Sequence, residues 1–146
     1  MNKPIYLDYA ATTPVDNDVI KEMLPFFTEN FGNAGSATHQ FGWFANGAIK
    51  RARKQIANSI NCEESEIIFT SGATESINIA IQGVFNLYAS KGNHFIISKT
   101  EHKAVIDTVN FLKKKGARVT YLDVDSNGLI NLEELKNSIC NETILI

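Results

Sequence analysis

The sequence predicts an α/β fold with a largely parallel sheet. From residue 66 onward, three short apolar runs alternate with three helical patterns. The apolar runs span 66–70, 94–98 and 118–122, and the helical patterns span about 73–90, 103–115 and 132–139. Strands that alternate with helices of this length are typical of a sheet whose strands are joined by crossover helices. Gly92 and Gly116 follow two of the helices, where a glycine commonly ends a helix.

The first sixty residues predict helices and two long loops instead of strands. Asp16 or Asn17 can cap a short amphipathic helix, and Pro25 predicts a kink in it. A longer helix from about Phe44 to Ile60 has an apolar stripe at four-residue spacing: Phe44, Ala48, Ala52, Ile56 and Ile60. The loops around 8–14 and 31–42 are rich in small residues, and long loops of this kind usually carry function or lie at an interface. We therefore expect an arm of loops and helices, 1–60, and the first part of an α/β domain, 61–146.

Composition excludes several classes of protein. The chain has 146 residues, 44% of them hydrophobic and 21% charged, which is typical of a globular domain. A net charge of -2 gives no reason to expect nucleic acid or an anionic membrane as a partner. Cys62 and Cys140 have no paired spacing, which indicates a reducing compartment. No apolar run has transmembrane length and no signal peptide is apparent, so we expect a cytoplasmic protein.

The segment Ser71–Ser76 is the strongest candidate site. It joins the predicted strand 66–70 to the start of a helix, where unpaired amide groups and the helix dipole suit a phosphate or another anion. Gly72 would let the backbone come close to the ligand, and Thr74 could donate from its hydroxyl group. The alternative is an ordinary helix cap made by Ser71 or Thr74, with Glu75 beside the dipole.

A second motif resembles a calcium-binding loop. The pattern from Asp123 through Asp125, Asn127 and Gly128 to Glu134 fits the EF-hand loop at each ligand position. An EF-hand needs a helix on both sides, whereas residues 118–122 read as a strand. We therefore favour a strand, a turn rich in Asp, Asn and Gly, and a helix.

His102 is the one histidine with a suggestive position. His39, His94 and His102 have no spacing that predicts a metal site, and no metal is expected. His102, however, follows the predicted strand 94–98 directly, at the edge where open α/β sheets bind ligands. The alternative is an ordinary surface histidine. Thr143–Ile146 reads as the start of a fourth strand, so the sheet is expected to be incomplete and the chain to be the front part of something larger.

Together these segments resemble the amino-terminal part of the cysteine desulfurases, pyridoxal-phosphate enzymes of the class-V aminotransferase type, and most closely those that supply sulfur for iron–sulfur clusters. The resemblance covers essentially the whole chain and implies the large domain of an aspartate-aminotransferase-like fold. The blocks that carry it are 6–14, 32–33, 39–43, 66–76, 98–107 and 128–135.

The resemblance implies roles for particular residues. Ala73 and Thr74 would bind the cofactor phosphate, and His102 would stack on the pyridine ring and move protons. Ala11 and Thr12 would lie near the substrate, and residues 33–42 would shape the mouth of the active site near a homodimer interface. The implied reaction converts L-cysteine to L-alanine and leaves the sulfur as an enzyme persulfide, with an iron–sulfur scaffold protein as a candidate recipient.

The chain departs from the family pattern in two respects. Ala34 stands where the family often has proline, and no lysine or cysteine of this sequence matches the family's Schiff-base lysine or persulfide cysteine. The expected protein is therefore a desulfurase piece that is inactive alone and is completed by a carboxyl-terminal half. The alternatives are a selenocysteine lyase or small aminotransferase of the same fold, or a non-catalytic gene remnant that acts as an interaction module.

Overall fold

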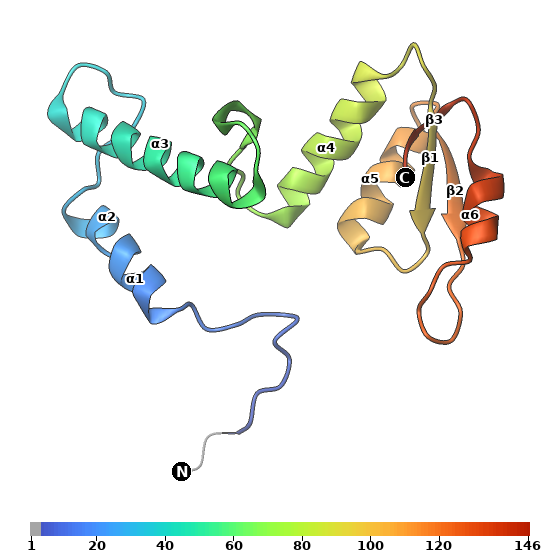
Figure 1. Cartoon of the computed structure of the whole chain (residues 1–146), viewed down its shortest axis with the longest axis horizontal. Coiled ribbons are helices and arrows are strands. Elements are labelled where there is room, and N and C mark those ends of the chain that lie inside the picture. The colour runs from blue at the N-terminus through green and yellow to red at the C-terminus, as the bar shows by residue number, and fades with distance from the viewer. Residues whose placement is uncertain (1–3) are drawn as a thin grey trace. The chain divides into compact units, whose positions relative to one another are not determined.

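The computed structural model describes residues 4–146 and divides the chain into two compact units, Met1–Ile68 and Phe69–Ile146 (Figure 1). The first unit contains α1 (Asn17–Met23), α2 (Pro25–Thr28), α3 (Gln40–Ile60) and the short 3-10 helix η1 (Glu64–Glu66). The second unit contains α4 (Ala73–Leu87), β1 (His94–Ser98), α5 (Lys103–Lys113), β2 (Arg118–Leu122), α6 (Leu132–Ser138) and β3 (Thr143–Leu145). The assignment of residues 1–60 and 61–146 to an arm and a cofactor domain stays a prediction.

The helices of the first unit begin at recognisable caps. The Asp16 side chain accepts a hydrogen bond from the Asp18 amide (2.8 Å) and caps α1, as predicted. Pro25 is the first residue of α2, so the expected kink takes the form of a break between two short helices. His39 caps α3 through Nδ1, which accepts from the Gly42 amide (3.3 Å). This cap explains why α3 starts four residues before the predicted Phe44.

The predicted apolar stripe of α3 is only partly covered, since Ala48 and Ala52 are half-buried and the other three residues are exposed. Phe44 is 49% exposed and Ile60 is 64% exposed, whereas the buried residues of the helix are Gly42, Ala45 and Ala57. A side chain at Gly42 would collide with the carbonyl group of Ser36. The helix is thus packed closely against the loop before it, and only small residues fit at that contact.

The second unit is an α/β layer whose three strands are all parallel. The strand order is β2-β1-β3, so β1 is central and pairs with both other strands. The predictions of strands at 94–98 and 118–122, and of the start of a strand at 143, are confirmed. Figure 1 shows α4 and α5 together on one side of the sheet, with α6 near β2.

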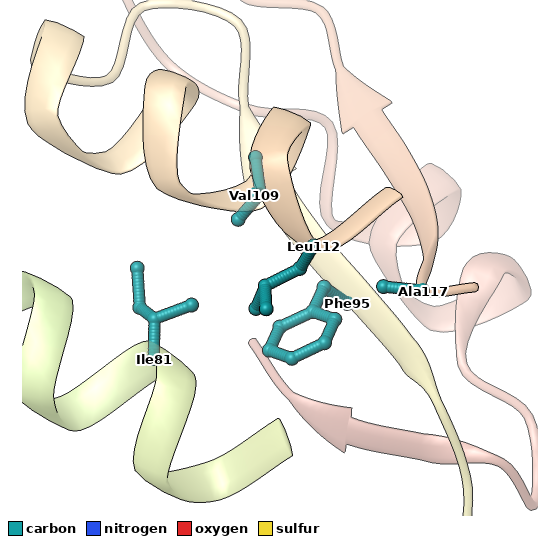
Figure 2. Packing of buried hydrophobic residues seen from close by; sticks show 5 residues of the cluster. All are labelled: Ile81, Phe95, Val109, Leu112 and Ala117. Atoms are coloured by element: carbon teal, nitrogen blue, oxygen red, sulfur yellow. The ribbon is translucent and has the colours of Figure 1, made fainter. Parts of the chain in front are cut away.

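The core of this unit forms between the sheet and the helices α4 and α5. The residues Ile81, Phe95, Val109, Leu112 and Ala117 form one buried cluster (Figure 2). Phe95 and Val109 are completely inaccessible to solvent. Burial of such side chains contributes about 1.5–3 kcal/mol each, so this cluster is what holds α4 and α5 on β1.

The predicted strand at 66–70 is wrong. Residues 64–66 form η1, and residues 67–70 have no regular structure. A strand needs a neighbour for its backbone hydrogen bonds, and residues 66–70 pair with none of the three described strands. Ile68 is 69% exposed, so the apolar character of the run does not correspond to burial within its own unit.

The two glycines after helices have different roles. Gly116 has a φ of 99°, the left-handed conformation that ends the turn after α5. Gly92 is not a helix-ending glycine with positive φ. A Cβ atom there would collide with the backbone carbonyl of Glu142, which also accepts the amide of His94 (3.0 Å). Gly92 therefore lets the segment before β1 approach the segment before β3.

The calcium-like segment is a backbone turn. The Asp125 carboxylate accepts from the amides of Asn127 (2.8 Å) and Leu129 (2.9 Å), which holds the pKa of Asp125 below its usual range. Gly128 has a φ of 81°, and Asn131 caps α6. Because β2 precedes this turn, it lacks the first helix of an EF-hand, as expected. Within residues 4–146, no helix has both the length and the apolar character needed to cross a membrane.

Candidate functional site

The amino-terminal end of α4 presents amide groups that the helix itself does not use. The first helical hydrogen bond joins the Ser76 amide to the Gly72 carbonyl (3.2 Å). The amides of residues 73–75 therefore have no acceptor within the helix. No side chain caps α4, so the predicted alternative of a Ser71 or Thr74 cap is wrong.

Hydrogen bonds around the turn explain why the cap is absent. The Glu75 carboxylate accepts from both the amide (2.6 Å) and the hydroxyl (2.8 Å) of Ser71, so the Ser71 hydroxyl is used by Glu75, and the N-cap residue Gly72 has no side chain. These two bonds hold the pKa of Glu75 below its usual range. The Thr70 and Ser76 hydroxyls pair with each other (2.7 Å). In the described part of the chain, the hydroxyl of Thr74 has no hydrogen-bond partner and can serve a ligand.

The space next to this turn is open. A Cβ atom at Gly72 would have no atom within 4 Å, so the backbone there can be approached from outside. Unpaired amides, a free hydroxyl and the dipole of a 15-residue helix together favour an anion such as a phosphate group. The residues present therefore fit a phosphate.

His102 lies at the carboxyl end of β1 and caps α5. Its Nδ1 atom accepts from the Ala104 amide (3.1 Å), so in the neutral ring the proton is on Nε2. The ring is exposed, which leaves Nε2 available to another molecule. Figure 1 shows that α4 runs against the direction of β1, so α4 begins toward the end of the sheet where β1 finishes. His102, which follows β1 and caps α5, belongs to the same end. This is the edge where open α/β sheets bind ligands.

Two lysines beside His102 are held by carboxylates. Lys99 forms an ion pair with Asp123 (2.6 Å), and Lys103 forms one with Asp107 (2.6 Å). The hydrogen bond that Lys103 donates to the Asp107 carboxylate raises the pKa of Lys103. Each ion pair joins one ammonium group to one carboxylate, so neither pair adds net charge to this edge of the sheet.

A pocket of about 320 Å³ lies among the carboxyl ends of the three strands. Its walls are mostly apolar and include Leu122 and Leu145, while Ser98 and Glu101 add polar groups. A pocket of this size and character suits a small organic molecule. Sequence reasoning did not single out Ser98 and Glu101, although Ser98 ends the predicted strand 94–98 and Glu101 follows it closely, which was a usable signal.

The predicted substrate residues lie in the other unit. The Ala11 amide donates to the Asp8 side chain (3.3 Å), and Ala11 and Thr12 are exposed in a short turn. The loop 33–42 is held by its own contacts, among them the bond from the Trp43 indole to the Ala37 carbonyl (2.6 Å). These residues are described within the first unit alone, and their roles near a substrate stay predictions.

Comparison with known proteins identifies the family. The profile of the class-V aminotransferases matches residues 5–146, so the chain belongs to this family, whose members depend on pyridoxal phosphate. "Cysteine desulfurase IscS" of Neisseria gonorrhoeae is 58% identical over 143 residues, which are 98% of this chain and 35% of that protein. The chain thus spans about a third of the length of the curated relatives it matches.

Solved structures give the same result. One titled "NIFS-LIKE PROTEIN" superposes with a TM-score of 0.89 at 41% identity, over 95% of this chain and 38% of that one. Another, titled "SspA in complex with cysteine", superposes with a TM-score of 0.85 at 40% identity, over 94% of this chain and 40% of that one. The sheet of three parallel strands is therefore an incomplete part of the fold found in pyridoxal-phosphate enzymes, as the sequence predicted.

Proposed function

We propose that this chain forms the cofactor-phosphate turn and the ring-stacking wall of a cysteine desulfurase. The uncapped start of α4 carries this proposal, because its amides and the Thr74 hydroxyl form a ready-made phosphate site. Ala73 and Thr74 would hold the cofactor phosphate, and His102 would stack on the pyridine ring. The identity of 58% to a desulfurase supports this assignment over other chemistries of the family.

In the proposed site, the start of α4 binds the cofactor phosphate and His102 transfers a proton. The amides at the start of α4 and the Thr74 hydroxyl anchor the phosphate, and this anchorage sets the position of the ring. The hydrogen bond from the Ala104 amide holds the His102 ring, so that Nε2 can give up or receive a proton at the substrate. Pyridoxal phosphate, when bound, supplies the electron sink that makes cleavage of the carbon–sulfur bond feasible.

The substrate and partners follow from the same proposal. L-cysteine would enter beside Ala11 and Thr12, since a solved relative is titled as a complex with cysteine. Residues 33–42 would contribute to a homodimer interface. A complementary carboxyl-terminal half would supply the remaining groups, and an iron–sulfur scaffold protein would receive the sulfur. We place the reaction in the cytoplasm.

A chimeric enzyme tests this function. These 146 residues would replace the matching third of the gonococcal relative, to which they are 58% identical over 143 residues. We expect alanine to form from cysteine in the presence of pyridoxal phosphate, and His102→Ala in the same chimera to reduce the rate by about 10²-fold or more. Retention of the cofactor absorbance would show that both proteins are folded.

The same chimera separates the alternatives. Faster turnover of selenocysteine than of cysteine would support a selenocysteine lyase, and transfer of amino groups to a keto acid would support an aminotransferase. A folded chimera that binds pyridoxal phosphate but forms no alanine from cysteine would refute the proposed desulfurase.

A further inference from the structure

Side chains in the first turns of α4 hold the two residues that precede this helix. The Glu75 carboxylate accepts from the amide (2.6 Å) and the hydroxyl (2.8 Å) of Ser71. The Thr70 and Ser76 hydroxyls lie 2.7 Å apart, and both are within hydrogen-bond distance of the Gly72 carbonyl, at 3.2 and 3.3 Å. Ser71 and Gly72 are thus each tied to the helix that follows them, and Glu75 is the side chain that holds Ser71.

Packing does not hold this turn. Residues 71–76 are all exposed, and a Cβ atom at Gly72 would have no atom within 4 Å. Glycine has more backbone freedom than any other residue, so a turn that contains it samples many conformations unless other bonds restrict it. The hydrogen bonds of the turn are therefore what restricts the chain where it enters α4, and with it the direction of the first helical amides.

The charge of Glu75 is unfavourable for the ligand that this turn is proposed to hold. A carboxylate beside the start of a helix interacts favourably with the helix dipole but repels a phosphate group. Glu134 is the third residue of α6, as Glu75 is of α4, and it shows the ordinary case. Asn131 caps α6, and within residues 4–146 the Glu134 carboxylate accepts no hydrogen bond. The two bonds to Ser71 distinguish Glu75, and a role at the dipole alone does not require them.

From this geometry we propose that Glu75 is a positioning residue for the cofactor phosphate, because it holds Ser71 so that the amides at the start of α4 meet the phosphate in a fixed arrangement. The inference rests on the proposed function, since it adds Glu75 to the phosphate turn of that site. The dependence of the family on pyridoxal phosphate is an independent reason to expect this ligand. Glu75 acts through Ser71 and does not touch the phosphate. A turn that is ordered before the ligand arrives does not have to be ordered at the expense of binding.

Two substitutions separate the charge of Glu75 from its hydrogen bonds. Glu75→Gln removes the charge but keeps an oxygen that can accept from Ser71, whereas Glu75→Ala removes both. The Kd for pyridoxal phosphate is measured by absorbance titration of the chimeric enzyme. We expect the Kd of Glu75→Ala to exceed that of Glu75→Gln by about five- to thirtyfold, the factor that corresponds to ordering the backbone of one residue. Glu75→Gln should bind at least as tightly as the wild type, because it lacks the repulsion.

Ser71→Ala tests whether Glu75 acts through Ser71. The Ser71 amide keeps its bond in this variant, so the Kd should rise by a smaller factor than in Glu75→Ala. When Glu75 is already alanine, Ser71→Ala should have no further effect, as for two residues that act as one unit.

Two controls show that the effect is specific. Glu134→Ala removes a glutamate from the corresponding position of another helix and should leave the Kd for pyridoxal phosphate unchanged. Pyridoxal, which lacks the phosphate, is the second probe. Its Kd should be the same in Glu75→Ala and Glu75→Gln, because the turn acts on the phosphate alone.

Each outcome bears on the proposal. A higher Kd for pyridoxal phosphate in Glu75→Ala than in Glu75→Gln, with equal Kd values for pyridoxal, supports it. Equal Kd values for pyridoxal phosphate in the two variants overturn it and leave Glu75 as a charge at the helix dipole. A difference of the same size for pyridoxal also overturns it. Thr74→Val tests the phosphate turn itself, so weaker binding in that variant, with no difference between the Glu75 variants, would refute the positioning role and leave the proposed function standing.

Discussion

At the scale of single residues, the proposed role of Thr74 in phosphate binding rests on a hydroxyl group that has no hydrogen-bond partner among residues 4–146. A threonine at the second residue of a helix often uses its hydroxyl locally, but here α4 has no side-chain cap and Thr74 has no partner among residues 4–146. Ser71 is occupied by Glu75, and Ser76 is occupied by Thr70. The Thr74 hydroxyl is therefore available to donate a hydrogen bond to an anion bound at the start of α4.

Replacing Thr74 by valine should weaken cofactor binding and leave the fold intact. Valine has a similar shape but no hydroxyl, and a hydrogen bond to a charged group contributes about 1.5–3 kcal/mol. In the chimeric enzyme we expect the Kd for pyridoxal phosphate to rise about tenfold or more, as measured by absorbance titration. Thr28→Val, at an exposed threonine at the end of α2, is the matched control and should leave the Kd unchanged. Equal Kd values for Thr74→Val and the wild type would mean that the turn does not bind the phosphate.

At the level of single elements, the segments before β1 and β3 meet closely at Gly92. The Glu142 carbonyl accepts the His94 amide at the start of the pairing between these strands, and Gly92 lies directly against that carbonyl. A side chain at Gly92 would force the two segments apart. Gly83, in the middle of α4, has open space around it, so a side chain there would collide with no other group.

Two alanine substitutions should therefore have opposite effects. Gly92→Ala introduces a collision with backbone atoms and should lower the free energy of unfolding by about 1–3 kcal/mol. Gly83→Ala should raise it by about 0.5–1 kcal/mol, because alanine favours the helix more than glycine does. Urea unfolding followed by circular dichroism measures both changes. A Gly92→Ala variant as stable as the wild type would contradict the close approach described here.

Sequence patterns predicted the elements that depend on local signals. The runs at 94–98 and 118–122 are rich in β-branched or aromatic residues and bounded by turn residues, and both are strands. The run at 66–70 has the same character but is not a strand, because strand formation depends on a partner that local sequence does not reveal. For the same reason, the stripe from Phe44 to Ile60 coincides only in part with the covered side of α3, because the helix also packs against the loop at Ser36.

The candidate site was predictable in position and less so in detail. The turn at Ser71–Ser76 and His102 both follow from the rule that ligands bind where strands end and helices begin. The bond between Glu75 and Ser71, which leaves α4 uncapped, depends on rotamers that a sequence does not specify.

For the molecule as a whole, the exposed apolar surface exceeds what an isolated small domain normally carries. In the first unit Phe27 is 72% exposed, Phe31 68% and Trp43 58%, and in the second unit Leu87 is 76% exposed. Contiguous exposed apolar area usually marks a surface that another protein segment covers. This agrees with a chain that spans 35% of its gonococcal relative, in which further residues complete the fold.

We predict that these 146 residues alone form no alanine from cysteine. Covalent attachment of pyridoxal phosphate needs a lysine amine that is unprotonated and held near the aldehyde. Lys99 and Lys103, the lysines nearest to His102 in the sequence, form ion pairs with Asp123 and Asp107, and the second pair raises the pKa of Lys103. The purified chain would be incubated with pyridoxal phosphate and cysteine, both alone and mixed with the remaining two thirds of the gonococcal relative. Borohydride should trap no single lysine adduct on the lone chain, and alanine should appear only in the mixture. A stoichiometric adduct at Lys99 or Lys103, or alanine formation by the lone chain at an enzymatic rate, would show that this part of the enzyme is sufficient for the chemistry.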